Sequence, residues 1–300
     1  MVDTAELVKE GLNIKDSELD LREKELKDED IVEIMKSGEI KGITALFLEF
    51  NEIGDDGLRA ILECPAMKNL TVLNLFKNEV TDDSVKAMAK SKSMLNLSEL
   101  ILSDNKVSSE GAKAMAESNI LGNLVSLWVG DGLGDEGAVA IATSKSLTRL
   151  TQLSLYRNNI SDEGAIAIAR SSNLSKLTEL NLNWNFIETV GAIALAHSKS
   201  LTRLARLYLC SNGIGDAGHC DDQGARAVST RCGRSDGCQG RGGPRGYSLR
   251  GRQRGTGSPQ GEHDNGTSGR KSDLALRQRG NHPCRRPPNP RRTPRRLRAP

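Results

Sequence analysis

The chain has 300 residues, of which 37% are hydrophobic and only 3% aromatic, and its formal net charge is +3. This apolar content is ordinary for a soluble protein, and the length allows one or two domains. The first twenty residues are polar and acidic, with no apolar run, so we expect neither a secretory signal nor a membrane-spanning segment. Only Cys64 and Cys210 precede residue 217, which excludes a disulfide framework there and predicts a cytoplasmic protein.

The first predicted element is a helix within residues 1–17. The stretch from Asp3 to Glu10 has an amphipathic pattern. The terminal unit of a stacked array needs a polar cap. We therefore expect residues 1–17 to form an N-terminal cap helix.

A 27-residue period runs through the two hundred residues that follow. Sequence similarity at such a period is typical of units that bury their apolar faces only by stacking. One interval, the fifth, is a residue shorter than the others. The period predicts about eight repeats over residues 18–218, each marked by one leucine: Leu19, Leu46, Leu73, Leu100, Leu127, Leu153, Leu180 and Leu207.

Each repeat follows the pattern L-x-L-x-x-N-x-I-x-D-x-G-A-x-A-I-A, which is best preserved from Leu153 to Ala169. The short L-x-L alternation predicts a strand with both leucines in the core. Asp162, as an N-cap acid, and the alanines after it predict a helix that packs closely on the strands. Each repeat is therefore expected to contain a strand, a turn and a helix.

An asparagine occupies the turn of most repeats. Its side chain can bond to backbone groups in its own turn and along a stack of turns. We therefore predict a structural ladder made by Asn51, Asn78, Asn105, Asn158, Asn185 and Asn212.

The pattern resembles the leucine-rich repeats of the ribonuclease-inhibitor type, a family that includes Ran GTPase-activating protein and the repeat domains of NOD-like receptors. The resemblance covers about Glu18 to Gly218. It implies an α/β solenoid, a curved right-handed horseshoe with parallel strands on the concave face and helices on the convex face. The family mostly provides binding scaffolds, so the resemblance also implies protein binding.

The repeat that starts at Leu127 departs from the pattern, because it lacks one residue and its asparagine. We expect a local distortion there. Gly132, Gly134 and Gly137 of this repeat match the spacing of a dinucleotide-binding fingerprint. However, Gly137 is the ordinary glycine of the repeat, and Arg157 stands about 20 residues on, where such a site needs an acid. We therefore predict no cofactor.

The aromatic residues predict the binding surface. Seven of the nine fall at strand positions that alternate with the core leucines, or at the strand ends, and such positions face the concave side. Aromatic residues on an open face are typical of an interaction surface. The alternative is that some of them cover neighbouring repeats. The predicted partner-binding residues are Phe47, Phe50, Phe76, Trp128, Tyr156, Arg157, Trp184 and Tyr208.

Catalytic motifs are scarce. His197 is the only histidine before residue 217, and its position at a helix end is typical of a solvated side chain. The chain has no phosphate-binding loop motif, zinc-protease motif, nucleophile elbow or paired cysteines. We therefore predict a non-enzymatic scaffold, without metal or cofactor, that binds another protein and no membrane. The resemblance to Ran GTPase-activating protein leaves regulation of a small GTPase as an alternative.

The repeat pattern ends after Gly218. Residues 1–216 carry 23 Lys and Arg against 33 Asp and Glu, whereas residues 217–300 carry 19 against 6. We expect residues 219–300, rich in Arg, Gly and Pro, to be disordered. Read one base later, the codons that follow Gly218 offer Ala-Ile-Ala-Met-Ile-Lys, which is the missing helix of the repeat. We therefore interpret residues 219–300 as a frameshift product.

Two functional interpretations of this tail stand beside that hypothesis. Its arginines and glycines resemble those of disordered RNA-binding tails, so nucleic acid is a partner if the tail is genuine. His219, Cys220, Cys232 and Cys238 are candidate zinc ligands, but their spacing fits no standard site.

Overall fold

A computed structural model of the protein describes residues 3–38 and 40–215. All structural statements below concern these residues. The predictions for residues 219–300, including the RNA-binding and zinc alternatives, lie outside them.

The described residues contain one nine-stranded sheet in which the strands follow chain order. β1 (Leu12–Asn13) is antiparallel to β2 (Glu18–Asp20), and every later strand is parallel to its neighbour. The repeat leucines pair directly, as Leu46 does with Leu73. The later strands are β3 (Ala45–Phe47), β4 (Val72–Asn74), β5 (Glu99–Ile101), β6 (Ser126–Trp128), β7 (Gln152–Ser154), β8 (Glu179–Asn181) and β9 (Arg206–Tyr208).

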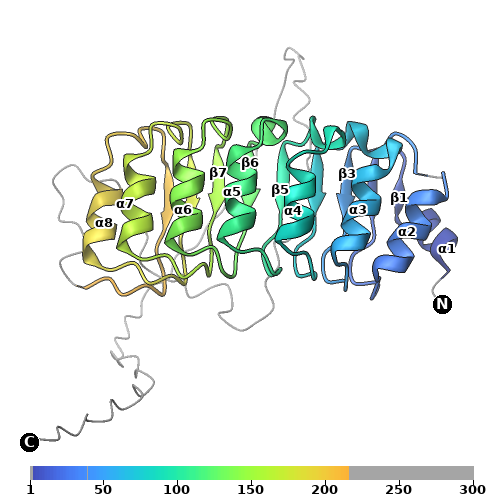
Figure 1. The fold of residues 1–300 in the computed structure, drawn as a ribbon, viewed down its shortest axis with the longest axis horizontal. Coiled ribbons are helices and arrows are strands. Elements are labelled where there is room, and N and C mark those ends of the chain that lie inside the picture. The colour runs from blue at the N-terminus through green and yellow to red at the C-terminus, as the bar shows by residue number, and fades with distance from the viewer. Residues whose placement is uncertain (1–2, 39, 216–300) are drawn as a thin grey trace, which may run out of the picture. The chain divides into compact units, whose positions relative to one another are not determined.

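The helices form a row along one side of this sheet, in chain order (Figure 1). Short 3₁₀ turns η1 (Pro65–Asn69), η2 (Lys92–Met94) and η3 (Ile120–Asn123) lead back toward the strands. In the part of the chain described, no helix has both the length and the apolarity to cross a membrane. The helices are α1 (Thr4–Gly11), α2 (Asp28–Lys36), α3 (Asp55–Glu63), α4 (Asp82–Met88), α5 (Ser109–Glu117), α6 (Gly134–Thr143), α7 (Asp162–Arg170) and α8 (Thr189–Ala196).

The core lies between the helix row and the sheet. Leu46 and Leu48, the two leucines of one L-x-L motif, are fully buried, and their equivalents are buried in every repeat. The core cluster of the described residues consists of Leu, Ile, Val, Met, Ala and Cys and contains no aromatic side chain. These findings confirm the predicted α/β solenoid.

Asparagine side chains join successive repeats at the turns. Asn78 Oδ1 accepts from the backbone N of Ile53 at 3.0 Å, and its Nδ2 donates to the carbonyl of Leu48 at 2.9 Å. Both partners belong to the preceding repeat. An unpaired buried polar group costs about 1–3 kcal/mol, so these bonds hold each turn in place. The same pattern is made by Asn51, Asn78, Asn105, Asn158, Asn185 and Asn212.

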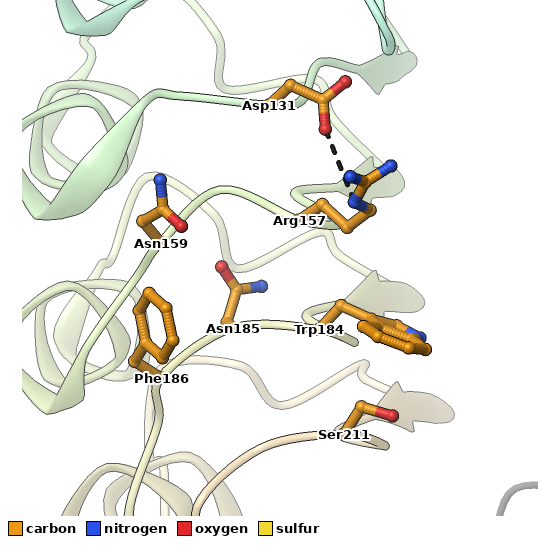
Figure 2. A pocket seen from close by; sticks show the side chains of 7 residues that line it. All are labelled: Asp131, Arg157, Asn159, Trp184, Asn185, Phe186 and Ser211. Carbon is orange, nitrogen blue, oxygen red and sulfur yellow. Dashed lines mark ion pairs between the residues drawn. The ribbon is translucent and has the colours of Figure 1, made fainter. Parts of the chain in front are cut away.

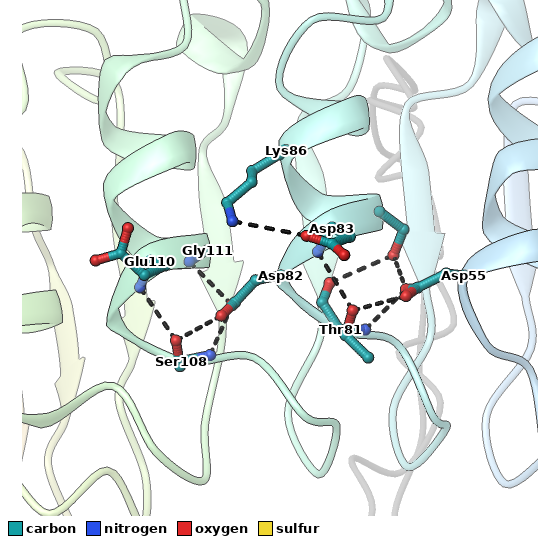
Figure 3. A network of polar contacts seen from close by, with 9 residues as sticks. Asp55, Thr81, Asp82, Asp83, Lys86, Ser108, Glu110 and Gly111 are labelled. Atoms are coloured by element: carbon teal, nitrogen blue, oxygen red, sulfur yellow. Dashed lines mark hydrogen bonds and ion pairs between the residues drawn. The ribbon is translucent and has the colours of Figure 1, made fainter.

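Aspartates make a second ladder at the helix N-termini (Figure 3). Asp82 accepts from the backbone N and Oγ of Ser108, at 2.8 and 2.5 Å, and from Gly111 N at 2.9 Å. Asp55 accepts from the backbone N and Oγ1 of Thr81 and from the Oγ of Ser84. Each aspartate of this ladder therefore satisfies backbone donors at the start of the following helix.

The prediction that Asp162 is an N-cap is wrong by one residue. The N-cap of α7 is Ser161, whose Oγ accepts from Glu163 N at 3.2 Å. Asp162 is the first helical residue, and its carboxylate accepts from Gly191 N of the next repeat at 2.8 Å. The Asp162 carboxylate therefore caps a backbone donor of the next helix, α8, and not one of its own helix.

The expected distortion of the repeat that starts at Leu127 is present. Asp131 has φ of 99° and Gly134 has φ of 61°. α6 starts after Leu133 without a side-chain cap, and Gly134 N donates instead to the carbonyl of Asn158 at 2.8 Å. The shortened turn therefore leads into α6 without a capping side chain, and Gly134 adopts the left-handed conformation at the first residue of the helix.

Candidate binding surface

The strand face is the side of the sheet opposite the helices. Phe47 and Glu49 alternate with the buried leucines of β3 and its extension, as predicted for this face. The eight predicted binding residues differ in exposure: Arg157 and Trp184 are exposed, and the other six are half-buried. Asn74, Ile101 and Ser154 on the same face are buried, so the larger side chains also cover their neighbours.

Three of the predicted residues lie near the N-terminal end of this face. The rings of Phe50 and Phe76 meet edge to face, with centroids 5.3 Å apart. Arg22 lies over the Phe47 ring at 5.5 Å, and Lys77 over the Phe50 ring at 5.1 Å. These rings are therefore already partly engaged with neighbours on the surface.

Glu49 is a buried acid beside these rings. It is 4% exposed and accepts from Asn74 Nδ2 at 2.6 Å, while its Oε2 has no hydrogen-bond partner among the described residues. Burial raises the pKa of Glu49 to about 7. The sequence places Glu49 on the strand face but gives no sign that neighbouring side chains bury it.

A column of residues with a left-handed backbone conformation follows the strands, and we call it the corner column. Each of them stands one position before the turn residue, which is asparagine in most repeats. Backbone bonds continue through it, as from Phe50 N to the Phe76 carbonyl at 3.0 Å. A left-handed conformation costs roughly 1–2 kcal/mol for a residue with a side chain. The corner residues adopt it because the stacking of the repeats holds the backbone in this conformation. The corner column is Glu23, Phe50, Lys77, Asp104, Asp131, Arg157, Trp184 and Ser211, with φ between 55° and 99°.

A pocket of about 310 Å³ opens beside the corner column near the C-terminal end of the described array (Figure 2). Asn185 lies between its two walls, and its side chain is engaged in the asparagine ladder. The walls are formed by Asp131, Arg157, Trp184 and Ser211 on one side and by Asn159 and Phe186 on the other.

Two charged residues line the pocket, Asp131 and Arg157. Arg157 Nε is 3.7 Å from Asp131 Oδ1, and the Asp131 carboxyl also contacts that of Asp104. Burial is the main cause that raises the pKa of Asp131 to about 7, and the Asp104 carboxyl adds to it, while Arg157 opposes the shift. The Asp131 carboxyl therefore interacts with one other carboxyl group and with one guanidinium.

The structure brings only two of the predicted binding residues, Arg157 and Trp184, into this pocket. Phe186 was missed, because it follows the turn asparagine rather than lying on a strand, yet it is 65% exposed. An aromatic residue at a solvent-facing turn position was the available signal. No cluster of three or more potential metal-ligating side chains occurs within residues 3–38 and 40–215.

Comparison with known proteins identifies the repeats. The family model "Leucine Rich repeat" matches residues 43–62, 66–89, 93–116, 146–169 and 173–196. These five segments of the chain are therefore similar to leucine-rich repeats. The matches leave out residues 117–145, the stretch that contains the shortened turn of the repeat that starts at Leu127.

Ninety chains of solved structures also match this chain. One is the plant peptide hormone receptor RGFR1 in complex with RGF2, with 21% identity and a TM-score of 0.39. The match covers 66% of this chain and 28% of the receptor chain. No curated protein sequence matches.

Proposed function

We propose that this chain is a non-enzymatic, ribonuclease-inhibitor-like scaffold that binds another protein in the cytoplasm through the strand face and its corner column. The observation that carries the proposal is the placement of its aromatic residues. No aromatic side chain joins the core cluster of the described residues; the seven on the strands and corners, and Phe186 at a turn, lie outside it. Aromatic residues dominate the binding energy of many protein interfaces.

The location of the rings also argues for binding rather than for stability alone. Leucine, isoleucine and alanine fill the space between sheet and helices, so the fold does not require large rings. Trp184 and Phe186 remain 50% and 65% exposed. Large exposed apolar side chains that gather on one surface typically mark an interaction site.

The test is a pull-down with the full-length chain, comparing the wild type with Trp128→Ala and Tyr156→Ala. We expect each change to weaken capture of the partner at least tenfold, a typical loss for an interface hot spot. Glu163→Gln, at an exposed position on α7, is the matched control and should bind as the wild type does. Unchanged capture by both aromatic variants would exclude the strand face as the binding surface.

A further inference from the structure

The outer face of the helix row has two kinds of surface. In α3, α4 and α5 an acid of the first turn forms an ion pair with a cation three residues later. In α6, α7 and α8 an apolar residue takes the place of that cation: Val139, Ile166 and Ile193. The ion pairs of the first three helices are Asp56 with Arg59, Asp83 with Lys86 and Glu110 with Lys113.

The apolar residues form a continuous patch, which we call the helix band. In each of its three helices an alanine follows the apolar residue, and both lie between positions that share the outer side of the helix. α6, α7 and α8 pack side by side (Figure 1), so the patch crosses all three. The helix band consists of Val139, Ala140, Ile166, Ala167, Ile193 and Ala194, none of which is fully buried.

The composition of α8 indicates that the helix band is covered by another surface. No charged residue lies between Thr189 and Ala196. Val190, which stands where α3 to α7 carry an acid, is 61% exposed, and Ile193 is 38% exposed. A helix that is apolar on all sides is normally buried, and exposed apolar patches typically mark interaction sites.

The charges of α7 indicate which surface fits the band. Glu163 stands at the start of the helix and Arg170 at its end, and both are exposed. Neither side chain takes part in an ion pair among the described residues. The two residues are separated by about 10 Å along the helix axis. An antiparallel copy of the same helix would bring each of them to the opposite charge.

We propose that two copies of the chain pair through the helix band, with α7 of one copy antiparallel to α7 of the other. The two-fold axis passes between Ile166 and Ala167, so each of these side chains contacts the other type in the second copy. Glu163 then faces Arg170 of the second copy, and symmetry repeats this pair. α6 and α8 lie on their own counterparts and bring the remaining apolar residues together.

The size of the helix band predicts a weak dimer. α6, α7 and α8 contain 10, 9 and 8 residues. Such helices are about 12–15 Å long and pack about 9 Å apart, so the band covers roughly 350 Å² in projection. Each partner of a standard interface buries about 800 Å² of accessible surface. We therefore expect a reversible dimer with a dissociation constant of about 10–100 µM.

The experiment is sedimentation velocity of the full-length chain under reducing conditions, over concentrations that bracket the expected dissociation constant. Glu163→Arg and Arg170→Glu should each weaken the dimer at least tenfold, because each places like charges opposite each other at two symmetric sites. The double variant with both changes should return to the wild-type dissociation constant, because opposite charges face each other again.

Two further variants separate the apolar contact from general damage. Ile166→Lys introduces the residue that α4 and α5 carry at the equivalent position, so the fold accepts it. It should weaken the dimer at least tenfold, because it places a charge at the centre of the apolar contact. Glu63→Arg changes the exposed last residue of α3, which is equivalent to Arg170. It is the matched control and should dimerise as the wild type does.

Recovery in the double variant supports the inference, because the two side chains form no pair within one copy. A double variant as weak as the single ones overturns it, as does a dimer that survives Ile166→Lys. A chain that stays monomeric at every concentration overturns it as well, and a different protein would then be the occupant of the band. The band lies across the core from the strand face, so partner capture below micromolar concentrations tests the proposed function independently.

Discussion

At the scale of the residue, the strand face contains an acid that opposes folding at neutral pH. Burial raises the pKa of Glu49 from 4.5 to about 7, so the folded state holds the proton more tightly than the unfolded chain. The contribution of Glu49 to stability is therefore most favourable below about pH 4.5 and is lost as the pH rises toward 7.

Glu49→Gln removes this titration. We expect the variant to exceed the wild type in free energy of unfolding by roughly 1–3 kcal/mol at pH 8, with little difference near pH 4. Urea unfolding at pH 4, 6 and 8 measures the difference. Glu63→Gln, at an exposed position on α3, is the control and should follow the wild type. A Glu49→Gln advantage that is independent of pH would contradict the explanation by burial.

The corner column predicts an unusual effect of glycine. Glu23 has φ of 57°, where a side chain is strained and glycine is not. We expect Glu23→Gly to raise the free energy of unfolding by about 0.5–1 kcal/mol. Glu63→Gly, at the last residue of α3 and outside the left-handed region, should lower it by less than about 1 kcal/mol. Thermal or urea unfolding gives both values, and a loss of stability in Glu23→Gly would mean that its side chain makes a stabilising contact.

At the scale of the element, each helix depends on the repeat before it. Asp82 accepts three hydrogen bonds at the start of α5. Asp82→Ala leaves those donors without their partner and should lower the free energy of unfolding by about 2–4 kcal/mol. The adjacent Asp83 makes only an exposed ion pair with Lys86 at 3.7 Å, so Asp83→Ala should change stability by less than about 1 kcal/mol. Similar losses in the two urea-unfolding curves would exclude the ladder as the cause.

The elements were predictable to the extent that they depend on local pattern. The alternation around Leu153 identified a strand, and the asparagine spacing identified the turns, because both follow from one repeat. The role of Asp162 was not predictable in detail, because its partner Gly191 is 29 residues away. The pocket was missed for the same reason: it depends on which left-handed corners lie side by side.

At the scale of the described array, the shortened repeat that starts at Leu127 separates two regular stretches. Residues 117–145 fall between the matched repeats, and Asp131 lies within them. The residue is in the left-handed region like its neighbours in the corner column, but its φ of 99° differs from the 55° of Arg157. The irregular turn therefore sets the position of one pocket wall.

Among the turns that precede the helices, this turn should have the least protected backbone amides. Gly132 N reaches Asn158 Oδ1 only at 3.3 Å, and α6 has no side-chain cap. The equivalent turn before α7 is held by Asp135, which accepts from Ser161 N at 2.8 Å. Glycines and missing caps lower the free energy of local opening. We expect amide hydrogen exchange at residues 132–134 to be at least tenfold faster than at residues 159–161.

The measurement is amide hydrogen exchange of the full chain followed by mass spectrometry. Equal protection of the two turns would show that the shortened repeat is as rigid as the others, and the pocket wall that contains Asp131 would then be as fixed as the regular corners.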